Sequence, residues 1–402
     1  MKKFLSVLCI IVVIASLSVA FMGCKGTPRE NVLKIFLPGE YIDEEIFEEF
    51  ESWYLEETGK TVEVKIETFE VVEDISRSVE KGKADFDLVC PSDYMVEYLI
   101  RKNLLKKVNK EIIDVEAEGL FRPEYLTVAR EYDPNLEYSV PYMYGTLGIA
   151  YDKSKTHADI TSWTDLFGTT YAGSVSIKKS VRDAYAAACL YNARNTLSGL
   201  SGNAQKTAVQ AVFDDFTQSS MDAAQTLLIN TSKVWDGDNV KYEMAAGSSD
   251  VKVALMWSCD AGYVMNEYED EDGEIHQGYK SLWYVVPDEG GNIYMDNFCI
   301  SKYAVNEQAA NYFLKFLCTK DAAVANSKYA GAISPVAEAY KALYKEYSEN
   351  TEMYEGTEAG WKEMFLETMF PSAATLNRCG VMKDAKEREE YLGYMWSEVV
   401  AS

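Results

Sequence analysis

The chain has 402 residues, more than a single hydrophobic core usually serves, so we expect two lobes. Its 64 acidic residues outnumber the 39 Lys and Arg residues, and the resulting net charge of −25 disfavours nucleic acid as a partner while attracting small cations. An apolar share of 48% is ordinary for a folded protein.

The N-terminus, "MKKFLSVLCIIVVIASLSVAFMGCKGT", predicts an export signal over residues 1–23. Two lysines precede an apolar run, and a small residue stands before Cys24, as in the bacterial lipobox. We therefore expect Cys24 to carry lipid and residues 24–30 to tether the folded part to the cell membrane, facing the periplasm or the cell exterior. If the signal stayed uncleaved, its apolar run could serve as a short membrane anchor.

From Leu33 onward, strand patterns alternate with helix patterns, which indicates an α/β fold with a largely parallel sheet. The short apolar strand "VLKIF" comes first. Asp43 is placed to cap the helix that follows, and Gly59 is placed to end it. "TVEVKIE" and "ADFDLVC" predict two more strands, and a helix containing Val96 comes next.

The segment "YSVPYMYGTLGIAYDKS" around Pro141 predicts the first crossing from one lobe into the other. Helical patterns follow near residues 183–194 and 204–216, and then come the strands "VKVALMW" and "LWYVVP". "NIYMDNFCI" predicts the strand that returns to the first lobe. Asn306 is placed to cap the next helix, and residues 335–402 predict mostly helices.

Two features that could suggest a metal site lack the spacing for one. "EDEDGEIHQG" does not have the full pattern of a calcium loop and instead predicts a hairpin at Asp272-Gly273. The cysteines beyond the signal are scattered and mostly lie in apolar runs, so we expect buried free thiols and no metal. These cysteines are Cys90, Cys189, Cys259, Cys299, Cys318 and Cys379.

The stretch "GGNIYMDNFCIS", residues 290–301, places a carboxylate in an otherwise apolar strand. Ile293, Met295, Phe298 and Ile300 favour burial, yet Asp296 lies among them with no Lys, Arg or His close by in sequence. A buried carboxylate without a partner costs several kcal/mol or loses its charge. Asp296 is therefore either a hydrogen-bonded core acid or helix cap, or the anchor of a cation from outside the chain.

Polar and aromatic side chains also follow three of the predicted strands. In open α/β sheets, ligands bind beyond the carboxyl ends of the strands, so these clusters could face one pocket from two lobes. Taken singly, each tyrosine could be a half-buried surface aromatic and each acid a solvated loop residue or a helix cap. The clusters are Glu40 with Tyr41, then Ser92, Asp93 and Tyr94, and finally Trp257 with Asp260.

Five segments, in the order in which they occur, resemble the substrate-binding proteins of spermidine/putrescine ABC transporters. The resemblance extends from about residue 33 to residue 384. Its segments are "FLPGEYIDEEIFEEFE", "FDLVCPSDYMVEYLIRKNLLKKVNK", "YSVPYMYGTLGIAYD", "VALMWSCDAGYVM" and "EGGNIYMDNFCIS".

This resemblance implies a two-lobed, type II periplasmic-binding-protein fold. Each lobe would be a central mixed sheet flanked by helices, with the ligand cleft between the lobes. Lobe 1 would comprise residues 31–141 and 295–335, and lobe 2 residues 142–294 and 336–402. The resemblance further implies no enzymatic activity and no cofactor. The implied partners are a polyamine and the permease and ATPase of an ABC importer, with hinge closure around the ligand.

Carried across residue by residue, the resemblance makes Asp296 the acid that meets an ammonium nitrogen. Asp183 matches an acid at the far end of the amine, and Asp260 resembles the second acid of putrescine-preferring relatives. The candidate ligand-binding residues are Asp296, Trp257, Asp260, Asp183, Tyr41, Ser92, Tyr94, Tyr294, Glu40 and Ser180.

The chemistry of a polyamine agrees with such a lining. A polyamine is a thin apolar rod whose charges are about 6 Å apart across a four-carbon unit. Carboxylates at that interval would meet the charges, and aromatic faces would add roughly 0.5 to 2 kcal/mol for each cation that they cover.

The sequence departs from the family at several positions. Ser180 stands where spermidine binders carry an additional acid, and Pro38-Gly39 replaces an aromatic and a hydroxyl residue before Tyr41. Ala332 and Met382 stand where the family has a tyrosine and a glutamine. We therefore expect putrescine or another short diamine, with Asp296 holding one end and Asp260 or Asp183 the other.

Two other function classes stay open at this point. Paired acids could hydrolyse a glycoside, but His157 and His276 have no nucleophile signature nearby. The ligand could also be a sugar, an opine or a cationic amino acid. A ligand carboxylate would need a pocket arginine, and Arg182, the one candidate, is expected to pair with an acid of the chain instead.

Overall fold

The computed structural model describes most of the chain after the N-terminal 26 residues. The described residues are 27–80, 85–231, 233–236, 239–247, 249–269 and 273–402. The predicted export signal, Cys24 and Asp272 therefore lie outside the described residues. Within the described part of the chain, no helix is both long enough and apolar enough to cross a membrane.

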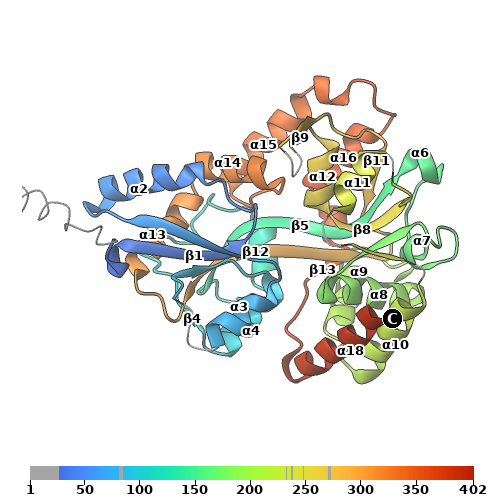
Figure 1. Ribbon diagram of the computed structural model, residues 1–402, viewed down its shortest axis with the longest axis horizontal. Coiled ribbons are helices and arrows are strands. Elements are labelled where there is room, and N and C mark those ends of the chain that lie inside the picture. The colour runs from blue at the N-terminus through green and yellow to red at the C-terminus, as the bar shows by residue number, and fades with distance from the viewer. Residues whose placement is uncertain (1–26, 81–84, 232, 237–238, 248, 270–272) are drawn as a thin grey trace, which may run out of the picture.

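Among the described residues, one mixed sheet of 11 strands runs along the molecule (Figure 1). Its path is β2-β1-β3-β12-β5-β8-β6-β7, and β4, β11 and β13 pair with the two central strands. These central strands are long and antiparallel, β5 (Ser139–Asp152) and β12 (Gly291–Ser301), and their register runs from Ser139↔Cys299 to Leu147↔Asn292. They connect two helix-covered halves of the molecule, which we call the β1 half and the β8 half.

The β1 half contains a parallel strand pair and short strands beside the carboxyl end of β12. Its strands are β1 (Val32–Pro38), β2 (Glu63–Phe69), β3 (Leu88–Val89) and β4 (Leu105–Lys106). Its helices are α2 (Glu45–Thr58), α3 (Glu73–Glu80), α4 (Asp93–Arg101), α5 (Pro123–Ala129), α13 (Glu307–Leu317), α14 (Lys320–Ala330) and α15 (Ala337–Glu349). A short 3-10 helix, η1 (Arg29–Asn31), precedes β1.

The β8 half repeats this plan at the other end of β5. Its strands are β6 (Val175–Lys178), β7 (Val234–Asp236), β8 (Val253–Trp257), β11 (Leu282–Val285) and β13 (Cys379–Gly380), with the pair β9 (Tyr268–Glu269) and β10 (Ile275–His276). Its larger helices are α7 (Trp163–Phe167), α8 (Val181–Leu197), α9 (Gly202–Phe213), α10 (Gln218–Asn230), α12 (Ser258–Met265), α16 (Trp361–Met369) and α18 (Glu389–Ala401). The shorter ones are α6 (Lys153–Thr156), α11 (Val240–Ala245), α17 (Ala373–Leu376), η2 (Glu352–Tyr354) and η3 (Lys386–Arg388).

Most local predictions are confirmed. Gly59 ends α2 in the left-handed region at φ 69°, and the Asn306 side chain accepts a hydrogen bond from the Ala309 amide at the start of α13. The strands of the predicted hairpin, β9 and β10, pair antiparallel, while residues 270–272 of its turn lie outside the described residues. The six described cysteines are free, and all are buried except Cys259, which is half-buried.

Two local predictions need correction. The N-cap of α2 is Glu44 rather than Asp43. The carboxylate of Asp43 nevertheless accepts a hydrogen bond from the Glu45 amide at 3.0 Å. The sheet is mixed rather than largely parallel, because β5 and β12 run antiparallel to each other and to β8 and β3, respectively. The predicted lobe boundaries stay a prediction. After β13 the chain contacts the β1 half, where Arg101 of α4 and Asp384 form an ion pair at 2.5 Å.

Candidate functional site

Asp296 lies where β12 passes from one half of the molecule to the other. The register between β12 and β5 shifts between Asp296 and Asn297, and such an irregularity redirects the side chains beside it. The Tyr41 hydroxyl donates to Asp296 Oδ2 at 2.6 Å, and the Ser92 hydroxyl donates to Oδ1 at 2.5 Å. Tyr41 follows β1 and Ser92 follows β3, so two strand ends of the β1 half converge on this carboxylate.

The charge of Asp296 has no basic partner within the described chain. No ion pair with Lys or Arg is formed there, and desolvation raises the pKa of Asp296 while the hydrogen bonds from Ser92 and Tyr41 oppose that rise. The side chain is nevertheless half-buried rather than fully enclosed, which leaves it accessible from outside the chain. Asp296 is thus hydrogen-bonded by two hydroxyl groups and available to an external cation.

Tyr294 and Trp257 form an aromatic wall on the side of the β8 half. Their ring centroids lie 6.1 Å apart, and the Tyr294 hydroxyl donates to Cys259 Sγ at 3.0 Å. Tyr294 crosses β5 at Gly145, where an added Cβ would stand 2.2 Å from the Tyr294 oxygen, so only glycine leaves room for this ring. Burial raises the pKa of Tyr294 most, and Cys259 raises it further. The charges of Asp296 and Asp260 add to this rise, because the phenol lies near both acids.

Asp260 is bound by two lysines of the chain. Lys178 Nζ lies 2.9 Å from Oδ2, and Lys241 Nζ lies 3.0 Å from Oδ1. Burial alone would raise the pKa of Asp260, but the charges of Lys178 and Lys241 outweigh burial and lower this pKa to about 2. Asp260 lies in the first turn of α12, and the N-cap of this helix is Trp257. Asp260 is therefore not a helix cap, which was one of the roles that the sequence allowed. That Asp260 binds an ammonium group of the ligand stays a prediction. Two lysines of the chain already pair with its carboxylate.

Lys178 lies between three predicted site residues. Besides its ion pair with Asp260, its Nζ is 3.5 Å from the centroid of the Trp257 ring. Burial raises the pKa of Asp183 to about 6, and the charge of Lys178 is the first influence that opposes this rise. The Ser180 side chain is the N-cap of α8 and accepts a hydrogen bond from the Asp183 amide, which gives Ser180 a local structural role.

Tyr94 and Arg182 meet at the boundary of the two halves. The guanidinium carbon of Arg182 lies 4.4 Å from the centroid of the Tyr94 ring, and the Tyr94 hydroxyl donates to Glu73 at 3.1 Å. Arg182 also forms an ion pair with Glu389 at 2.6 Å and donates to a backbone carbonyl, which confirms the prediction that it pairs within the chain. Glu40, the remaining candidate, is exposed, with a left-handed φ of 54°.

The sequence reasoning missed Lys178 and Lys241. Lys178 is the last residue of β6, a strand that was not predicted, so the rule that drew attention to residues after strand ends was not applied to it. Its pairing with Asp260, 82 positions away, could not be read from sequence spacing. Lys241 lies in the short helix α11 and carried no pattern that would have marked it.

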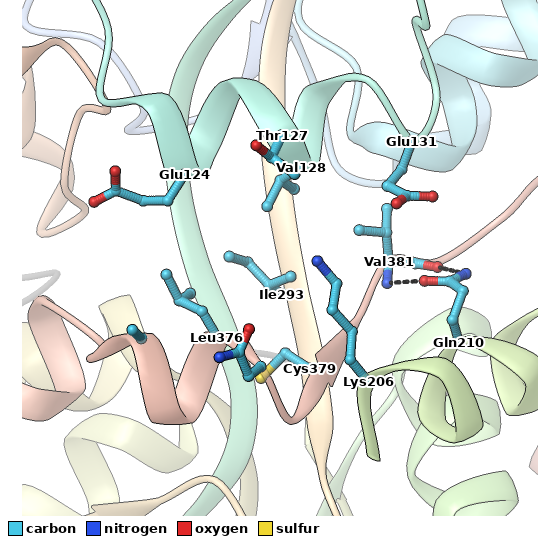
Figure 2. Close-up of a pocket in the computed structure, with 12 residues that line it drawn as sticks. Glu124, Thr127, Val128, Glu131, Lys206, Gln210, Ile293, Leu376, Cys379 and Val381 are labelled. Atoms are coloured by element: carbon cyan, nitrogen blue, oxygen red, sulfur yellow. Dashed lines mark hydrogen bonds between the residues drawn. The ribbon is translucent and has the colours of Figure 1, made fainter. Parts of the chain in front are cut away.

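A separate cavity of about 170 Å³ lies on the opposite side of β12 and contains none of the predicted site residues. Ile293 projects into it, whereas Tyr294, the next residue of the strand, belongs to the aromatic wall, since alternate side chains of a strand point to opposite faces. Figure 2 shows Ile293 between Val128 of α5 and Cys379 of β13. This cavity is therefore distinct from the surroundings of Asp296.

Residues 45–355 match the model of a protein family described as bacterial extracellular solute-binding protein. The spermidine/putrescine-binding periplasmic protein of Escherichia coli is 24% identical over 344 residues, which cover 84% of this chain and 87% of the relative. The putrescine-binding periplasmic protein PotF of Escherichia coli is 24% identical over 304 residues, 73% of this chain and 75% of the relative.

The solved structure of the lipoprotein Tp0655 (TpPotD) of Treponema pallidum superimposes on this chain with a TM-score of 0.67. The alignment covers 92% of this chain and 99% of that one, at 21% identity. This likeness confirms the predicted fold class, a mixed α/β structure of the type II periplasmic-binding-protein kind with a central mixed sheet.

Proposed function

Because the chain belongs to the family of bacterial extracellular solute-binding proteins, we propose that it is the binding component of an ABC importer for polyamines. The members of this family bind solutes for transport and are not enzymes, and we extend that assignment to this chain. The family resemblance and the relatives that bind spermidine and putrescine support an aliphatic amine as its ligand.

The observation that carries this proposal is the state of Asp296. Two hydroxyl groups orient its carboxylate, no described Lys or Arg neutralises it, and it stays partly exposed. An ammonium group satisfies such a carboxylate better than a neutral ligand, because it adds the attraction of an opposite charge to the hydrogen bond. The half-buried rings of Tyr41, Tyr294 and Trp257 would line the methylene groups of the same ligand.

The partners and the location belong to the same proposal. The ligand would bind in a cleft between the two halves, and closure of the halves would present the loaded form to a membrane permease driven by an ATPase. Cys24 would carry the lipid that tethers residues 24–30 to the outer face of the cytoplasmic membrane.

Isothermal titration calorimetry of the purified protein with putrescine, spermidine, N-acetylputrescine, glucose and octopine tests the ligand class. At least one of the amines should bind with a dissociation constant in the micromolar range or below, and the Asp296→Asn variant should lose most of that affinity. Asp159→Asn, at an exposed loop position, is the matched control. Binding of the sugar or the opine alone would overturn the proposal.

A further inference from the structure

Lys178 occupies the position that the second ammonium group of a diamine would need. Its Nζ lies 3.5 Å from the centroid of the Trp257 ring and 2.9 Å from Asp260 Oδ2. An aromatic face and a carboxylate are the two partners that recognise an alkylammonium group. The lysine side chain is itself a four-carbon chain with a terminal ammonium, and here it is buried, so the chain supplies its own cation at this point.

The carboxylate of Asp260 is already compensated within the chain. It has two lysine partners, at 2.9 and 3.0 Å, whereas the buried Asp183 forms no ion pair among the described residues and burial raises its pKa to about 6. Asp296 differs from Asp260, because its partners are the hydroxyl groups of Tyr41 and Ser92. Asp296 is therefore open to an external ammonium, and Asp260 is not.

We propose that Lys178 determines specificity by filling the second ammonium position, so that the site selects an amine with one free ammonium and a hydrogen-bond-accepting far end. The inference rests on the proposed function, since it takes binding of an aliphatic amine at Asp296 as given. The ammonium of the ligand meets Asp296, its methylene groups pass Tyr294 and Trp257, and its far end faces Lys178 and Lys241.

The chemistry of the far end follows from the groups that would surround it. A lysine ammonium has three N–H donors and no acceptor, so a carbonyl or carboxylate oxygen fits beside Lys178. A second ammonium there would meet the like charges of Lys178 and Lys241 and could not pair with Asp260 without displacing one of them. A mono-acylated diamine and an ω-amino acid share the favoured chemistry.

Three ligands with the same four-carbon chain separate these cases: putrescine, N-acetylputrescine and 4-aminobutyrate. They differ only in the far end, which is an ammonium, an amide or a carboxylate. In calorimetric titrations of the wild-type protein, at least one of the two acceptor ligands should bind roughly 10- to 100-fold more tightly than putrescine, as expected for a like charge a few Å away in a partly desolvated site. Which of the two binds more tightly distinguishes an amide from a carboxylate ligand.

Lys178→Met is the variant that tests the residue, because it keeps the apolar stem and removes the charge. Asp260 keeps Lys241 as its partner, whereas Asp183 loses the opposing charge of Lys178. The affinity for putrescine should rise by roughly 10-fold or more, and the affinity for the acceptor ligands should fall. Lys241→Met is the matched control. It also removes one cation from Asp260, but Lys241 lies beside Tyr242 and Tyr263 rather than over Trp257, so putrescine affinity should rise less.

The outcomes distinguish the failure of this inference from the failure of the proposed function. If the wild-type protein bound putrescine more tightly than both acceptor ligands, the role of Lys178 would be overturned and the proposed import of amines would stand. This result tests the role of Lys178 even if the Lys178→Met variant does not fold. A Lys178→Met variant that folds, by its thermal unfolding curve, and binds putrescine no better than the wild type would also overturn the role of Lys178. Absence of binding by all three ligands and by spermidine would overturn the proposed function as well.

Discussion

Replacing Asp296 by Asn should abolish amine binding while leaving the fold almost unchanged. The pKa of Asp296 is raised by desolvation, so the folded state holds this proton more tightly than the unfolded state, and stability is lost as the pH rises through the raised pKa. At neutral pH the ionised carboxylate therefore costs stability, about 1.4 kcal/mol for each unit of the rise. The amide removes this cost and keeps an oxygen that can accept from Ser92 or Tyr41, but it loses one hydrogen bond worth about 0.5 to 1.5 kcal/mol.

These opposing effects should leave the free energy of unfolding of the ligand-free variant within about 1 kcal/mol of the wild type. Binding should suffer far more, since removing one partner of a desolvated charge pair costs about 2 to 4 kcal/mol, or roughly 30- to 1000-fold in dissociation constant. Differential scanning calorimetry measures both effects. A ligand at 100 times its dissociation constant stabilises the wild type by about 2.7 kcal/mol, and the variant should show little of this shift. A variant that melts many degrees lower, or that keeps the full shift, would refute the reasoning.

Three further outcomes are expected. Amine affinity, measured by calorimetry, should fall on acidification through the raised pKa of Asp296, since a protonated carboxyl cannot pair with an ammonium; affinity that rises on acidification would contradict this. Gly145→Ala should lower the free energy of unfolding by about 1 to 3 kcal/mol in urea and weaken amine binding, because the new Cβ would displace Tyr294, whereas Gly393→Ala, with open space around it, should do neither. Asp260→Asn should cost about 3 kcal/mol or more in urea unfolding, since Lys178 and Lys241 would lose their shared carboxylate, and an unaltered stability would show that neither lysine depends on it.

The sequence was sufficient for features that depend on local pattern or on one strand end. Asn306 at the start of α13 and Gly59 at the end of α2 have residue types suited to those positions, and the structure contains both caps. The unusual position of Asp296 was also visible, because a carboxylate stands there in an otherwise apolar strand.

The partners of these acids could not be predicted from the sequence. Tyr41 and Ser92 reach Asp296 across 255 and 204 positions, and only the sheet order β1-β3-β12 brings their strand ends together. The same limit concealed Lys178, whose strand β6 lies beside β8, so that the ends of both strands meet at Asp260. Sequence reasoning therefore identified the acids but could not tell which acid the chain itself neutralises.

The position of the ligand nitrogen tests the central claim most directly. In a crystal structure of the protein with N-acetylputrescine, the primary ammonium nitrogen should lie about 2.7 to 2.9 Å from a carboxylate oxygen of Asp296, which still accepts from Tyr41 and Ser92. A complex in which that nitrogen contacts other groups, with Asp296 bound only to its two hydroxyl donors, would contradict the account.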